Sequence, residues 1–156
     1  MSVSHELSRQ SRRLLQIGVL FFLFTAFEGF SIPYLASPEL GLSVHRLGAF
    51  SGVFFLAWGL MWPQLNLGLT TSRVAFWLAI YSDLATVGAY MLAAVWGAGG
   101  SLIHLATSAP HGTAMQETII QIVIYSAAPT GITAFALMLW GLRGDERAQA
   151  AYGSST

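Results

Sequence analysis

The stretch HRLGAFSGVFFLAWGLMWPQL, residues 45–65, decides the fold class of this chain, because Arg46 is its only permanently charged residue. A helix needs about 20 consecutive, mostly apolar residues to cross the hydrocarbon core of a bilayer. Three further stretches meet that length, over residues 14–35, 74–96 and 118–142. Every backbone polar group must be satisfied inside a bilayer, so spans this long and continuous are predicted to be helices. The sequence therefore predicts an all-α, integral membrane four-helix bundle.

The overall composition fits one membrane domain over residues 1–156, ending in a polar tail over 144–156. Hydrophobic residues make up 54% of the chain and charged residues 9%, against about 25% charged in soluble domains. The seven basic residues balance seven acidic ones, which excludes a nucleic-acid binder because phosphate neutralisation needs a basic face. The absence of cysteine excludes disulfides, thiolate metal sites and cysteine nucleophiles.

The distribution of arginine predicts the orientation in the membrane. Loops on the cytoplasmic side carry an excess of basic residues, and all arginines except Arg46 fall on one side of the four expected spans. We therefore expect a multi-pass protein of the inner membrane with both termini in the cytoplasm and membrane lipid around it. These arginines are Arg9, Arg12, Arg13, Arg73, Arg143 and Arg147. Aromatic residues near the expected span ends suit the membrane interfaces; they are Tyr34, Trp62, Trp96 and Trp140.

Two acidic residues, Glu28 and Asp83, fall inside expected spans. An ionisable residue in the membrane is costly and is by default a functional-site hypothesis, although hydrogen bonding between helices is the simpler alternative. At a rise of about 1.5 Å per residue, Glu28, Ser51, Tyr90 and Tyr125 all lie roughly 10 Å below the outer boundary. One polar group per helix at one depth predicts a pocket inside the bundle.

Helical spacing groups other candidates on two faces. His45, Gly48 and Gly52 share a stripe on the second span, and such small residues allow close approach of another helix. The same stripe leaves open the approach of a flat ligand. His45 itself stands at the expected start of the span, where it either caps the helix at the interface or serves as a metal ligand. On the third span one face is formed by Asp83, Thr86 and Tyr90.

The runs GLSVHRLGAFSGVFFLAWGLMWPQL, WLAIYSDLATVGAYMLAAVWGAGG and LMLWGLRG are similar to those of hydroxylaminobenzene mutases and, more distantly, of styrene oxide isomerases. The resemblance implies a homotrimer of four-helix subunits with ferric haem b bound between neighbours. It also implies that His45 is the axial ligand of the haem iron and that Tyr90 helps to hold the substrate. Ser51 and Thr86 stand where the isomerases carry asparagine, and these shorter side chains leave room for a substrate other than styrene oxide.

On this resemblance we expect a haem-dependent isomerase that rearranges an aryl hydroxylamine, a small aromatic substrate, to a 2-aminophenol. Tyr90 would orient the substrate oxygen with support from Ser51 and Thr86, while Asp83 would tune the haem or receive a proton. The nearest alternative is an isomerase that converts an aryl epoxide to an aldehyde. Alternatives of other classes are a b-type cytochrome, which normally needs two axial histidines, and a membrane bundle without catalytic function.

Overall fold

The computed structural model describes residues 3–100 and 111–143, so the expected polar tail over 144–156 lies outside the described residues. The described part consists of four helices, α1 (Val3–Ser31), α2 (Pro38–Met61), α3 (Leu69–Trp96) and α4 (Ala114–Gly141). Short 3-10 turns, η1 (Ile32–Tyr34) and η2 (Trp62–Gln64), follow α1 and α2. All four helices are long and apolar enough to cross a membrane. The predicted all-α, four-helix membrane fold is confirmed.

The helices begin earlier than the expected spans, because apolar length marks the membrane core while local capping sets the helix ends. Pro38 occupies the first turn of α2, where its missing N–H costs nothing. Thr113 and Gln116 form a capping box at the start of α4, which satisfies two backbone N–H groups. At the end of α3, Gly97 adopts a left-handed conformation with φ 62°, a geometry that favours glycine. His45 therefore lies well inside α2, and the expected capping role is wrong.

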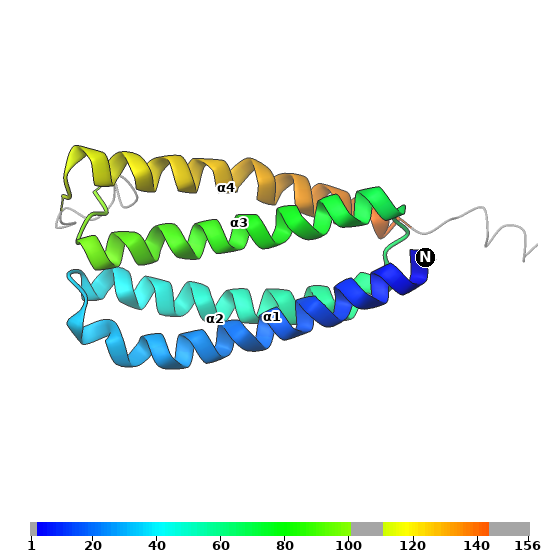
Figure 1. The fold of residues 1–156 in the computed structure, drawn as a ribbon, viewed down its shortest axis with the longest axis horizontal. Coiled ribbons are helices and arrows are strands. Elements are labelled where there is room, and N and C mark those ends of the chain that lie inside the picture. The colour runs from blue at the N-terminus through cyan, green and yellow to red at the C-terminus, as the bar shows by residue number, and fades with distance from the viewer. Residues whose placement is uncertain (1–2, 101–110, 144–156) are drawn as a thin grey trace, which may run out of the picture.

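The helices pack as two hairpins, α1 with α2 and α3 with α4, and α2 and α3 join them. In Figure 1 the start of α1 and the end of α4 lie at the same end of the bundle. Arg73 Nε donates to Glu6 Oε1 at 3.1 Å, and the Asn66 backbone N–H donates to the Gly141 carbonyl at 2.8 Å. These contacts tie the helix ends together where the arginines gather, while the side of the membrane that this end faces stays a prediction.

Glycines bring the backbones of α1 and α2 into close contact. A Cβ added at Gly18 would lie 2.9 Å from the Gly52 carbonyl oxygen, and one at Gly48 would lie 2.8 Å from Thr25 Oγ1. A Cβ at Gly52 would lie 2.9 Å from the ring of Phe22. The predicted close approach of a helix is therefore confirmed, and α1 rather than a flat ligand covers the stripe at Gly48 and Gly52.

Trp62 was expected at a membrane interface, but it lies inside the bundle. It is fully buried, and its indole Nε1 donates to Gln10 Oε1 at 2.8 Å. An indole buried among helices needs such a partner for its N–H group. Tyr34 and Trp140, by contrast, are exposed on the bundle surface, as aromatic residues at a membrane interface would be.

Candidate active site

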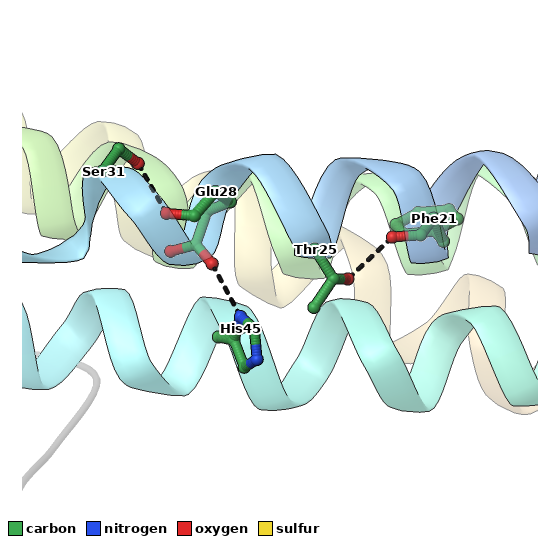
Figure 2. Close-up of polar contacts among 5 residues, drawn as sticks. All are labelled: Phe21, Thr25, Glu28, Ser31 and His45. Carbon is green, nitrogen blue, oxygen red and sulfur yellow. Dashed lines mark hydrogen bonds and ion pairs between the residues drawn. The ribbon is translucent and has the colours of Figure 1, made fainter.

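An imidazole and a carboxyl group meet where α1 packs on α2. His45 Nδ1 lies 3.3 Å from Glu28 Oε2, and Figure 2 shows the two side chains directed at each other across the helix pair. The Glu28 side chain is 1% exposed and that of His45 is 39% exposed. The second carboxyl oxygen, Glu28 Oε1, is buried without a hydrogen-bond partner. The pair thus joins a buried acid to an imidazole that is open to the outside of the bundle.

The neighbouring polar groups of α1 are satisfied within their own helix. Thr25 Oγ1 donates to the Phe21 carbonyl at 2.7 Å, and Ser31 Oγ donates to the Glu28 carbonyl at 2.7 Å. Such bonds back to the preceding turn are typical of Ser and Thr in membrane helices. They leave the Glu28 carboxyl group to pair with His45 across the helix contact.

Further candidate side chains lie on α2 and α3. Ser51 of α2 is buried, and Oδ2 of the partly buried Asp83 of α3 is buried without a hydrogen-bond partner. Thr86 Oγ1 donates to the Ser82 carbonyl of its own helix at 2.8 Å, so its oxygen is the atom left to accept a bond. Tyr90 is partly buried and packs against the hydrophobic core.

We expected a pocket with one polar side chain from each helix, and this prediction is wrong for Tyr125. Tyr125 of α4 is 69% exposed on the bundle surface, because a depth estimate fixes the level of a residue but not the direction of its side chain. Within the described residues, Glu28 pairs with His45. This pairing was not predicted, although both residues were singled out from the sequence.

An apolar groove of about 400 Å³ lies between α1 and α3, within the roughly 300–1,000 Å³ of small-molecule sites. Phe24, on its α1 side, is one helical turn from Glu28 and would touch a Cβ at Gly48. On its α3 side, Val87 and Met91 stand on either side of Tyr90 in the sequence. The groove suits a small aromatic molecule with little polar surface. Its lining is formed by Ile17, Leu20, Phe21, Phe24, Leu84, Val87, Gly88 and Met91.

Within residues 3–100 and 111–143 there is no group of three or more His, Cys, Asp or Glu side chains that could hold a metal ion. This part of the chain therefore offers no complete set of protein ligands for a metal. A metal that brings its own equatorial ligands and needs a single imidazole is compatible with the geometry at His45.

Fold and site together define a class: a multi-span helical membrane protein in which a buried carboxyl group pairs with a partly exposed imidazole near an apolar groove. The family model for styrene oxide isomerase matches residues 10–143, and the chain belongs to this family. It is 44% identical over 133 residues to hydroxylaminobenzene mutase HabB of Ectopseudomonas oleovorans, which covers 85% of this chain and 81% of HabB. Hydroxylaminobenzene mutase HabA of the same organism is 30% identical over 125 residues, covering 80% of this chain and 93% of HabA.

No solved structure matches the chain. The family model and the mutases nevertheless agree on the reaction class, since both names describe rearrangement within one molecule. The resemblance stated from the sequence is confirmed, and the chain is an isomerase.

Proposed function

We propose that the chain is a haem-dependent hydroxylaminobenzene mutase, which rearranges an aryl hydroxylamine to a 2-aminophenol. The observation that carries this proposal is the 44% identity to HabB over 85% of the chain. In the reaction the N–O bond breaks, a C–O bond forms at the ortho carbon, and the proton displaced from that carbon goes to nitrogen. Substrate and product have the same atoms and electrons, so no external reductant or oxidant is needed.

The residues at the α1–α2 contact fit a haem ligand. The contact with Glu28 uses Nδ1 of His45 and leaves Nε2, the nitrogen turned away from Glu28 in Figure 2, as the ligand atom. At 39% exposure the ring is open to a flat group at the outside of the bundle. Bound through this imidazole, ferric haem b would supply a Lewis-acidic iron to the substrate oxygen.

We assign the remaining work to side chains of α2 and α3. The Tyr90 hydroxyl donates to the substrate oxygen and orients it, with the hydroxyls of Ser51 and Thr86 in support. Asp83, whose Oδ2 is buried without a partner, takes up the proton displaced from the ring and passes it to the nitrogen. The apolar groove between α1 and α3 keeps water from the developing cation, because water would capture it and give 4-aminophenol instead.

The family resemblance and the open face of His45 support a homotrimer with one haem between each pair of neighbouring subunits. The arginine distribution supports insertion in the inner membrane with both termini in the cytoplasm. Small aromatic substrates partition into lipid, so an apolar groove on a membrane-embedded bundle suits their entry from the bilayer.

The test is incubation of the purified, haem-loaded protein with hydroxylaminobenzene in ¹⁸O-labelled water. The expected product is 2-aminophenol without label, because the oxygen stays within the molecule. Labelled 4-aminophenol, or no turnover, would contradict the proposal.

A parallel incubation with styrene oxide tests the second candidate, an aryl epoxide isomerase, which the match to the styrene oxide isomerase family model favours. Formation of an aldehyde from the epoxide, with hydroxylaminobenzene left unchanged, would select it. The optical spectrum separates the other classes. High-spin ferric haem agrees with an enzyme that has an open iron position, low-spin haem with two histidines indicates a b-type cytochrome, and colourless protein indicates a bundle without cofactor.

A further inference from the structure

We propose that Glu28 is a positioning residue for His45, holding the imidazole through Nδ1 so that Nε2 points to the haem iron. This inference rests on the proposed function, since it takes His45 as the haem ligand. Metal-bound histidines usually donate their second N–H to a carboxylate or carbonyl, which fixes the ring orientation and tautomer and makes the ligand nitrogen more basic. Glu28 offers a carboxylate for that bond.

The difference in exposure between the two side chains indicates which one holds the other in place. Glu28, at 1%, is enclosed between the helices, whereas His45, at 39%, reaches the outside. The 3.3 Å contact between Nδ1 and Oε2 therefore joins an enclosed carboxyl group to a partly exposed imidazole ring. A buried carboxyl group is costly unless it is hydrogen-bonded, so its presence here calls for a partner or a function.

The backbone around the pair is shaped to admit the ring. A Cβ at Gly29 would lie 3.2 Å from His45 Cε1 and 3.3 Å from Nδ1, so any side chain at position 29 would press on the imidazole. The absence of a side chain at Gly48, one turn further along α2, lets Thr25 and the α1 backbone approach. These glycines bring Glu28 within reach of His45 and leave space for the imidazole beside the α1 backbone.

Glu28→Gln and Glu28→Leu test the inference, with Thr25→Val as the matched control. Gln keeps an acceptor oxygen of similar shape, whereas Leu removes the acceptor. Thr25 lies on the same face of α1 one turn away and bonds only to its own helix among the contacts seen. We expect loss of the Glu28 carboxylate to weaken haem affinity by roughly 10–100-fold in Glu28→Leu, with a smaller loss in Glu28→Gln and none in Thr25→Val.

The decisive readout is the iron–histidine stretching frequency of the ferrous protein, measured by resonance Raman spectroscopy. A weaker bond at Nδ1 makes Nε2 a poorer donor, so the frequency should fall in the order wild type, Glu28→Gln, Glu28→Leu. Thr25→Val should keep the wild-type frequency. A change in helix packing alone would not produce this order, and if Glu28→Leu does not fold, Glu28→Gln decides.

Two failures are distinguishable. If the wild-type protein binds no haem, or His45→Ala keeps the iron–histidine band, the haem assignment of the proposed function is wrong and the positioning role falls with it. If the wild type shows the band, His45→Ala loses it, and both Glu28 variants keep the wild-type frequency and haem affinity, only the positioning role is overturned.

Discussion

Gly18→Ala tests whether the close α1–α2 contact stabilises the fold. A Cβ at this position would lie 2.9 Å from the Gly52 carbonyl oxygen and 3.0 Å from the Leu56 backbone nitrogen. Both are backbone atoms of α2, so no side-chain rotation relieves the overlap and the helices must separate. Overpacking of this kind costs about 1–3 kcal/mol, while replacing glycine by alanine in a helix interior gains up to about 1 kcal/mol. With the full gain from helix propensity, the expected net loss of stability is about 0–2 kcal/mol.

Gly88→Ala is the matched control, because Gly88 also lies inside a helix but a Cβ there would meet nothing within 4 Å. It should gain up to about 1 kcal/mol from helix propensity alone. A difference of about 2 kcal/mol corresponds to roughly 4–8 °C in the midpoint of thermal unfolding for a chain of this size. Tryptophan fluorescence in detergent micelles, at equal haem loading, measures both midpoints. Equal midpoints for the two variants would refute the assignment of stability to the glycine contact.

Four further outcomes are expected. Tyr90→Phe should lower the turnover of hydroxylaminobenzene about tenfold or more with haem content unchanged, because it removes one hydrogen bond to the substrate oxygen; wild-type turnover would show that the hydroxyl is idle. Gln10→Ala should destabilise the fold by about 1–3 kcal/mol, because it leaves the buried indole N–H of Trp62 without its partner; an unchanged unfolding midpoint would contradict this. Arg73→Ala, at an ion pair whose arginine side chain is 56% exposed, should cost less than about 1 kcal/mol, and a larger loss in the same assay would assign the pair a structural role. A fluorescent protein fused after the last residue should fluoresce, and alkaline phosphatase fused there should be inactive; active phosphatase would place that end outside the cytoplasm.

The number and type of the helices could be predicted from the sequence because a bilayer imposes a single length scale on apolar runs. Residues 74–96, for example, end at the same residue as α3, where the left-handed Gly97 stops the helix. Hydropathy does not predict where a helix begins outside the hydrocarbon core, and α1 begins at Val3, well before the expected span. Turns of helix beyond the core are stabilised by caps and polar contacts, which apolar length does not measure.

Depth along a span could be estimated, but the direction of a side chain around the helix axis could not. Tyr125 and Trp62 are the two residues whose side-chain direction was predicted wrongly. Tyr125 lies on the exposed face of α4, whereas Trp62 is enclosed and bonded to Gln10. In a soluble protein the polar face of a helix marks the solvent side, but in the membrane both faces are apolar. The sequence pattern then gives little information on which face is inside.

Predicting that Glu28 pairs with His45 would have required the exact position of the turn between α1 and α2. In an antiparallel helix hairpin, residues equally distant from the turn lie opposite each other. Glu28 is eight residues before Ala36, and His45 is eight residues after Ser37; Thr25 and Gly48, which also meet, are each eleven residues away. Apolar length alone put the connection at residues 36–44 and so shifted the centre of the hairpin away from Ala36 and Ser37. Ser-Pro at residues 37–38 was the available signal, because proline favours the first turn of a helix, and a helix begun there aligns the acid with the imidazole.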